Sequence, residues 1–174
     1  MKIIKTKAKD IYIISHKKIK DSRGFFMRSF CKKIFKKKGI NFDIRQINFS
    51  FNKKKYTLRG FHYQKKPFSE KKIINCIKGS AFIVLLNVNK KSKNYLKFIK
   101  IKLNEKIKKS LFVSENYATA FLTLKVNTLI IYYMSNYYNS KYSSGLKFND
   151  PKIGIKWPAK PSSISKKDLN FKKI

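Results

Sequence analysis

Short apolar segments separated by turn residues follow one another through the middle of this 174-residue chain. Residues 99–103 show the pattern most clearly, since three apolar residues alternate there with two lysines, a period typical of a strand with one buried face. Gly79 stands between two apolar runs and predicts a hairpin turn. The expected strands are residues 11–14, 72–77, 81–88, 99–103, 111–113, 118–124 and 128–134. Their spacing predicts a mainly β protein, a sandwich or barrel that forms a single domain over residues 1–174.

Turn and helix signals mark the first quarter of the chain. Residues 21–24, Asp-Ser-Arg-Gly, predict a turn in which the glycine is free to take a positive φ. After this turn, Phe26, Phe30 and Ile34 recur every four residues. This spacing predicts a short amphipathic helix that ends near Gly39.

The chain is strongly basic, with 43 Lys and Arg against 8 Asp and Glu and a formal net charge of +35. Its lysines occur in every stretch of the chain, whereas nucleic-acid-binding proteins more often gather their positive charge on one face or arm. No zinc-finger spacing, basic zipper region or RNA-binding sheet signature is present. We therefore expect a solvated lysine surface and no specific nucleic-acid partner, with only weak, salt-sensitive attraction to polyanions. A nucleic-acid-binding protein stays an alternative that the net charge alone motivates.

No segment predicts a membrane span or a secretory signal. The longest apolar run after the first residues covers 129–134, whereas a spanning helix needs about 20 residues. Lysines interrupt the apolar start of the chain, where a signal peptide needs an unbroken apolar stretch. The two cysteines, Cys31 and Cys76, are too few for a disulfide framework and favour a reducing compartment. We expect a cytoplasmic protein without a membrane partner.

Few side chains in the sequence suit acid–base chemistry, because only two histidines are present, His16 and His62. Neither has a second histidine or a cysteine at metal-ligand spacing, so no metal site is expected. Strand alternation places His62 and Gln64 on one face, where His62 suits either a general base or a hydrogen-bonded structural histidine. Lys72 suits either an oxyanion stabiliser or a solvated strand end. The tyrosines of residues 132–138 suit either a general acid or sheet packing.

Several short motifs follow one another along the chain: DSRGFF at 21–26, QINFS at 46–50, LRGFHYQ at 58–64, KKIINCIKG at 71–79, YYMSNYY at 132–138, FNDPKIGIKWP at 148–158 and SKKD at 165–168. Together they resemble the motifs of the dTDP-4-dehydrorhamnose 3,5-epimerase family, a metal-free branch of the cupin superfamily. LRGFHYQ is the most specific, since the family reads LRGLHxQ. The resemblance implies a cupin-like jelly-roll β-barrel that works as a homodimer. It also implies an isomerase that acts on a nucleotide-linked 4-keto-6-deoxy sugar in dTDP-rhamnose-type biosynthesis for a surface polysaccharide, without a cofactor.

The same resemblance implies roles for individual residues. His62 matches the base that removes a proton next to the keto group, and Asp168 matches the acid that orients its imidazole and stabilises its charge. Lys72 matches the lysine that stabilises the enolate at O4, and Tyr138 matches the tyrosine that returns a proton to the opposite face. The remaining matches are substrate-binding positions: Tyr132 near the sugar, Arg59 in the sugar-nucleotide site, and Arg23, Gln46 and Asn48 on the nucleotide side, with Arg23 expected to reach the partner subunit's site.

Asn116 and Ala120 stand where the family has glycines, and three further departures change an ionisable side chain. Thr119 stands where a histidine is expected, Ile83 where an aspartate is expected, and Arg28 where a glutamate is expected. Because the expected base, its aspartate, the lysine and the tyrosine are all present, we favour an active enzyme with an altered substrate or a reduced rate. The alternatives are a 3-epimerase on a different keto sugar and a catalytically decayed relative that still binds a sugar nucleotide.

Overall fold

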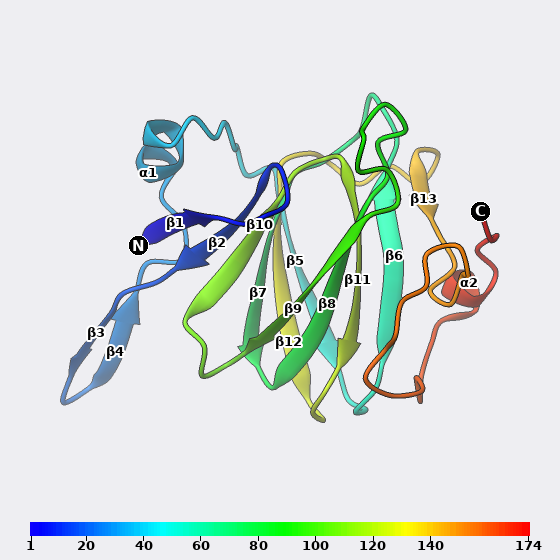
Figure 1. Cartoon of the computed structure of the whole chain (residues 1–174). Coiled ribbons are helices and arrows are strands. Elements are labelled where there is room, and N and C mark those ends of the chain that lie inside the picture. The colour runs from blue at the N-terminus through cyan, green and yellow to red at the C-terminus, as the bar shows by residue number, and fades with distance from the viewer.

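Two antiparallel sheets face each other in the computed structural model, which describes residues 1–174 (Figure 1). The first sheet contains, in spatial order, β1 (Lys2–Lys5), β2 (Ile11–Ser15), β10 (Lys109–Val113), β7 (Lys72–Lys78), β12 (Thr128–Met134) and β5 (Gln46–Asn52). The second sheet contains β13 (Ser143–Gly145), β6 (Leu58–Gln64), β11 (Tyr117–Thr123), β8 (Ser80–Asn87) and β9 (Phe98–Asn104). This arrangement is a jelly-roll β-barrel, so the expected fold class is confirmed.

The main core lies between the two sheets, because alternate residues of each strand point inward. Ile74 and Cys76 on β7 pack in the same cluster as Ile83 and Leu85 on β8. All four are buried. The apolar runs at 72–77 and 81–88 therefore predicted two strands correctly, β7 and β8.

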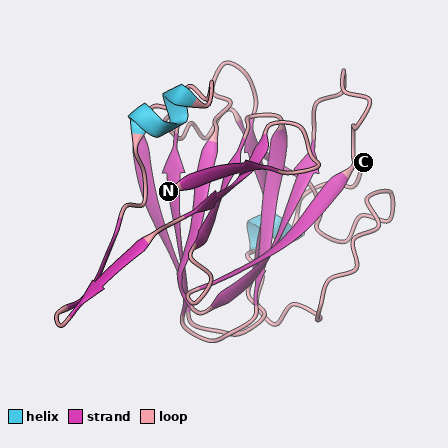
Figure 2. Cartoon of the chain, turned by 60° about the vertical axis from the view of Figure 1, so that its left-hand side comes forward, coloured by secondary structure: helices cyan, strands magenta, loops and turns pink.

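A second cluster covers the outer face of the first sheet. The helix α1 (Lys32–Lys37) places Phe35 against Phe112 of β10 with 6.0 Å between ring centroids, and Phe42 joins them. Phe30 packs on Phe35 at 5.1 Å, although it precedes the helix. Figure 2 shows this helix at the edge of the strands.

The helix expected to run from Phe26 begins only at Lys32, so that part of the prediction is wrong. Residues 24–27 form strand β4 (Gly24–Met27), which pairs with β3 (Lys18–Asp21) in a hairpin that projects beyond both sheets (Figures 1 and 2). The predicted turn at residues 21–24 is confirmed, and Gly24 has φ +130°. Phe26 is exposed because the hairpin lies away from the barrel. The apolar residues have the spacing of an amphipathic helix, but the pairing of β4 with β3 determines the structure of this segment.

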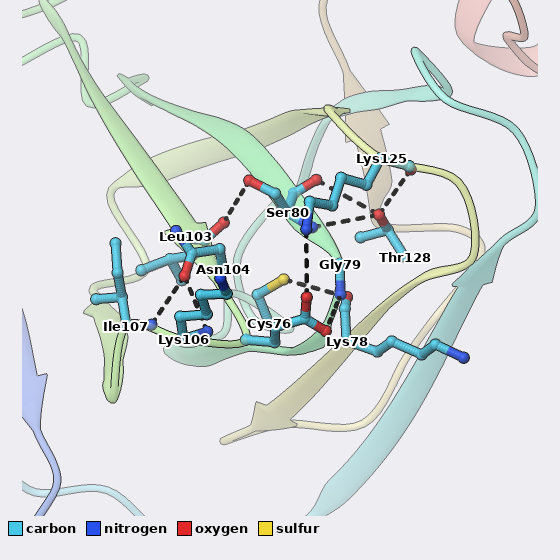
Figure 3. Close-up of polar contacts among 11 residues, drawn as sticks. Cys76, Lys78, Gly79, Ser80, Leu103, Asn104, Lys106, Ile107, Lys125 and Thr128 are labelled. Carbon is cyan, nitrogen blue, oxygen red and sulfur yellow. Dashed lines mark hydrogen bonds and ion pairs between the residues drawn. The ribbon is translucent and has the colours of Figure 1, made fainter.

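The turn between β7 and β8 is held by the chain segments around it (Figure 3), but it is not a hairpin turn, because β7 lies in the first sheet and β8 in the second. Gly79 has φ +79° and donates its backbone N–H to Glu105 Oε2 at 3.0 Å. Lys125 Nζ lies 3.4 Å from Glu105 Oε1. Thr128 crowds the glycine, since a Cβ atom at residue 79 would lie 2.9 Å from Thr128 Cα. The turn at Gly79 was predicted correctly, but the expected hairpin was wrong, because two consecutive apolar runs do not show whether their strands pair with each other. The crowding shows why glycine is required at this turn.

Neither helix of the structure is long and apolar enough to cross a bilayer. The second helix, α2 (Lys166–Leu169), lies against β6 near the end of the chain (Figure 1).

Candidate active site

A cavity of about 610 Å³ opens between the two sheets. β5, β7 and β12 of the first sheet line one side of it, and β6 and β11 of the second sheet line the other. Residues 163–168, which include the start of α2, complete the wall. The expected site residues that line this cavity are Gln46, Asn48, Arg59, His62, Lys72, Tyr132, Tyr138 and Asp168.

His62 and Asp168 form a hydrogen-bonded pair in the cavity wall. Their Nε2 and Oδ1 atoms are 2.7 Å apart, although the residues are 106 positions apart in the chain. The Asp168 side chain is 3% exposed, whereas that of His62 is 42% exposed. With Nε2–H donated to the carboxylate, Nδ1 is the ring nitrogen left to accept a proton. The pair has the geometry of an oriented general base.

Backbone contacts fix the position of Asp168. Its Oδ2 atom accepts the Gly60 N–H at 3.1 Å. The Ser165 hydroxyl caps α2 by accepting the Asp168 N–H at 3.1 Å. Burial acts to raise the pKa of Asp168, but the hydrogen bond and charge of His62, with the donors at Gly60 and Ser165, outweigh it and hold the pKa below its usual range. Asp168 therefore stays an anion beside the imidazole at neutral pH.

Lys72 begins β7 and reaches into the cavity with a side chain that is only 7% exposed. Its Nζ atom lies 3.0 Å from Glu70 Oε1 and 3.3 Å from both the His62 carbonyl and Thr119 Oγ1. The alternative of a solvated strand end is therefore wrong for this lysine. A buried ammonium beside a general base suits the stabilisation of an oxyanion. Sequence reasoning missed Glu70, although it is one of only 8 acidic residues in the chain and stands two positions before Lys72.

Arg59 on β6 of the second sheet makes a polar contact with β5 of the first sheet. Arg59 Nε donates to Asn52 Oδ1 at 2.9 Å. Burial raises the pKa of Tyr132, which also lines the cavity, and the positive charge of Arg59 opposes that shift. Sequence reasoning missed Asn52, although the period of two that leads from Gln46 through Asn48 along β5 points to it.

The rim of the cavity is formed by residues on β5 and after β12. Gln46 Nε2 donates to Asn48 Oδ1 at 2.8 Å, and Gln46 Oε1 accepts the Tyr138 N–H at 3.0 Å. Tyr138 is 58% exposed, so its phenol meets both the cavity and solvent. That position suits a group that exchanges protons with water.

Arg23 is the one expected site residue that lies outside the cavity of its own chain. It occupies the turn of the β3–β4 hairpin, where its guanidinium is 2.6 Å from Asp21 Oδ2.

The other histidine of the chain, His16, also lies outside the cavity. It is buried and bonds the Arg28 carbonyl at 3.0 Å and the Ser110 hydroxyl at 2.8 Å, so it is a structural histidine.

Comparisons with known proteins agree on one family. The family model described as dTDP-4-dehydrorhamnose 3,5-epimerase matches residues 5–174. A curated relative of that name from Shigella flexneri is 33% identical, with 100% of this chain and 96% of the relative covered. The chain belongs to the dTDP-4-dehydrorhamnose 3,5-epimerase family.

Solved structures of this family are similar over nearly the whole chain. The dTDP-4-dehydrorhamnose 3,5-epimerase of Bacillus anthracis, solved with TDP and PPi bound, gives a TM-score of 0.95 at 29% identity and covers 99% of both chains. The epimerase of Legionella pneumophila, solved in complex with dTDP-4-keto-L-rhamnose, gives 0.93 at 28% identity, with 99% of this chain and 92% of that chain covered.

The three departures from the epimerase family pattern that change an ionisable side chain lie in different places. Thr119 lines the cavity, where its hydroxyl contacts Lys72. Ile83 is fully buried and pairs with Phe121 across the sheet, so an apolar side chain completes the core there. Arg28 follows β4 and does not line the cavity. Thr119 is therefore the departure that contacts a site residue.

No group of three or more His, Cys, Asp or Glu side chains lies together in the structure. The residues of the epimerase cavity that can exchange protons are of several chemical kinds: one imidazole, two lysine ammonium groups, two carboxylates and three phenols.

Proposed function

We propose that this chain epimerises a dTDP-4-keto-6-deoxy sugar at carbons next to the keto group, as an isomerase of dTDP-rhamnose-type biosynthesis for a polysaccharide. One observation carries the proposal: the His62–Asp168 pair and the Lys72 ammonium line the same cavity. Epimerisation next to a carbonyl needs a base, an oxyanion stabiliser and an acid on the other face. Relatives that carry the epimerase name and the bound dTDP-4-keto-L-rhamnose of the Legionella structure support the choice of substrate class.

The first half of the reaction removes a proton. His62 Nδ1 takes the proton from C3 or C5, and the electron pair of that C–H bond moves onto the keto oxygen to form an enolate. Lys72 stabilises the developing negative charge. Asp168, held as an anion, stabilises the imidazolium that forms.

The second half returns a proton to the same carbon from the opposite face. Tyr138 donates it, the enolate electrons return to carbon, and the configuration inverts. The exposed phenol then recovers its proton from solvent. Replacing Tyr138 with Phe should slow product formation about 10- to 1000-fold and slow the first proton loss less. Equal losses in deuterium exchange and product formation would remove Tyr138 from this role.

We propose that the nucleotide is held by Arg59, Gln46 and Asn48, with Tyr132 beside the sugar. The diphosphate of such a substrate suits the guanidinium of Arg59, which lines the open cavity. The TDP in the Bacillus anthracis structure supports a nucleotide ligand for this fold. Arg59→Met should then weaken dTDP binding, measured by calorimetry, and leave the fold intact.

We further propose that two copies form a homodimer in which the β3–β4 hairpin brings Arg23 to the partner's cavity. Apolar side chains that a monomer exposes on the hairpin and on β5 support this assembly. They are Ile19, Phe25, Phe26, Ile47, Phe49 and Phe51. Light scattering should give twice the chain mass, and Phe49→Asp should shift the measured mass toward that of the monomer.

We place the protein in the cytoplasm, where its two free cysteines stay reduced.

Proton NMR of dTDP-4-keto-6-deoxy-glucose with the protein in deuterated water tests the function. Deuterium should enter at C3 and C5. Label at C3 alone would make the chain a 3-epimerase. Absence of exchange with retained nucleotide binding would favour a catalytically decayed binder, which the cavity departure at Thr119 motivates. Chelators should leave the rate unchanged.

A further inference from the structure

We propose that Glu70 is a positioning residue of this site, which keeps the Lys72 ammonium charged and directed at the reacting oxygen. This role rests on the one proposed for Lys72 in enolate stabilisation. It extends the site to a residue outside the sequence motifs that carry the proposed chemistry.

The contacts of Glu70 are limited to one group. Its side chain is 3% exposed, and its Oε1 atom lies 3.0 Å from Lys72 Nζ. Its Oε2 atom is buried without a hydrogen-bond partner. Asp168, by contrast, accepts a backbone N–H in addition to its contact with His62. Glu70 therefore ties no backbone segment in place through its carboxylate, and the group that it holds is Lys72.

The energetics of burial point the same way. A carboxylate and an ammonium taken out of water lose solvation that their mutual attraction seldom repays, compared with apolar residues of similar size. A buried ammonium without a counter-charge tends to lose its proton. A neutral amine at Lys72 would be a poor partner for an enolate. Fold stability therefore does not account for the buried Glu70–Lys72 pair, whereas the need for a charged Lys72 in the cavity does.

Three contacts orient the ammonium of Lys72, and one of them is shorter than the other two. The ion pair to Glu70 is the shortest, and the contacts to Thr119 Oγ1 and the His62 carbonyl are both 3.3 Å. An incoming anionic oxygen replaces the longer, weaker contacts more readily than the ion pair. Lys72 then meets the substrate from one side while Glu70 holds it from the other.

The variant Glu70→Gln keeps the shape of the side chain and removes its charge, and Glu105→Gln at the β7–β8 turn is the matched control. In the exchange assay, Glu70→Gln should lower kcat about 10- to 100-fold, since misplacing a group that acts in the transition state has effects of this size. KM should change less than about threefold. The control should keep the wild-type rate. Wild-type kcat in Glu70→Gln would overturn the proposal.

The pH profile separates a charge role from a merely structural one. Without the Glu70 carboxylate the neutral amine forms more easily, so the loss of activity at high pH should begin at a lower pH in Glu70→Gln. The other titratable and charged groups that line this cavity are Arg59, His62, Tyr63, Tyr132, Tyr138, Lys167 and Asp168. All of them are unchanged in the variant. An unmoved high-pH limb would contradict the proposed role.

A double-mutant cycle with Lys72→Met tests the pair without any activity. Glu70→Gln should lower the denaturant midpoint in the wild-type background and lower it much less beside Lys72→Met, because the unpaired ammonium is then gone. Equal effects in both backgrounds would show that Glu70 does not hold Lys72. A wild-type protein that exchanges no proton would overturn the proposed function and the catalytic part of this role. The cycle would still report the pairing.

Discussion

Glu70 and Glu105 each pair with a lysine, Glu70 with Lys72 in the cavity and Glu105 with Lys125 at the β7–β8 turn. The Glu105 pair lies at the surface, with side chains 36% and 56% exposed, and Glu105 also accepts the Gly79 N–H. The cavity pair is 3% and 7% exposed, and no backbone N–H donates to Glu70.

The difference separates an acid that shapes the backbone from an acid that maintains a charge. The hydrogen bond from Gly79 is the largest cause that lowers the pKa of Glu105, so this carboxylate acts on a turn. Both cavity acids pair with titratable side chains, Glu70 with Lys72 and Asp168 with His62, and Glu70 does so without any backbone donor. Substitutions in the cavity should therefore change chemistry more than stability, and substitutions at the turn should do the reverse.

The largest effect is expected from His62→Ala, which removes the base. Deuterium exchange at the sugar should fall by at least about 1000-fold, since no other imidazole lines the cavity. The half-exposed side chain contributes little packing, so the variant should stay folded, with a lower melting temperature because the buried Asp168 loses its partner. Exchange near the wild-type rate in a folded variant would reject His62 as the base.

Asp168→Asn should have the next largest effect, because it keeps an oxygen near His62 but removes the charge. Loss of the corresponding carboxylate in serine proteases costs about 10⁴-fold, and we expect a loss of about 10²- to 10⁴-fold in kcat. Full activity in the variant would show that orientation alone suffices.

The same variant should change the acid stability of the fold. Because the pKa of Asp168 is lowered in the folded protein, its carboxylate contributes stability above its ordinary pKa, and that contribution is lost as the pH falls through the lowered value. As the pH is lowered, the free energy of unfolding should therefore fall further in the wild type than in Asp168→Asn, which has no carboxylate at this position. Parallel stability curves for the two proteins would contradict this linkage.

Gly79→Ala at the β7–β8 turn should lower stability and leave the chemistry unchanged, which is the reverse of the effect expected in the cavity. The added Cβ atom would meet Thr128, and alanine is strained at φ +79°. The free energy of unfolding should fall by about 1–3 kcal/mol, measured by urea denaturation. The exchange rate per folded molecule should be unchanged. A rate that falls with stability would show that the turn and the cavity are coupled.

The elements that sequence reasoning predicted correctly depend on local periodicity. The strand expected at 99–103 lies within β9, because one of its faces packs on the core and the other meets solvent. The helix expected from Phe26 failed because Phe26 pairs with Ile19 across a hairpin, and periodicity within one segment carries no information about such a partner.

The site residues also differ in whether local periodicity in the sequence could predict them. His62 and Gln64 lie on one strand face as alternation predicted, and both line the cavity. Asp168 could be assigned only through the family resemblance, because 106 residues separate it from His62. Glu70 lies close to Lys72 in sequence and was still missed, because burial decides its importance and the sequence does not show which of its charges are buried.

The smallest effect is expected from Lys125→Met, which removes the exposed partner of Glu105. Exposed ion pairs contribute little because water and salt screen them. The Gly79 hydrogen bond to Glu105 remains in the variant, so the turn keeps its main contact. We expect a melting temperature within about 2 °C of the wild type, with the difference vanishing in high salt, and an unchanged exchange rate. A larger loss that persists in high salt would mean that the lysine, and not the backbone hydrogen bond, fixes Glu105. The position of Glu105 at the β7–β8 turn would then depend on its lysine, as the position of Lys72 in the cavity is proposed to depend on Glu70.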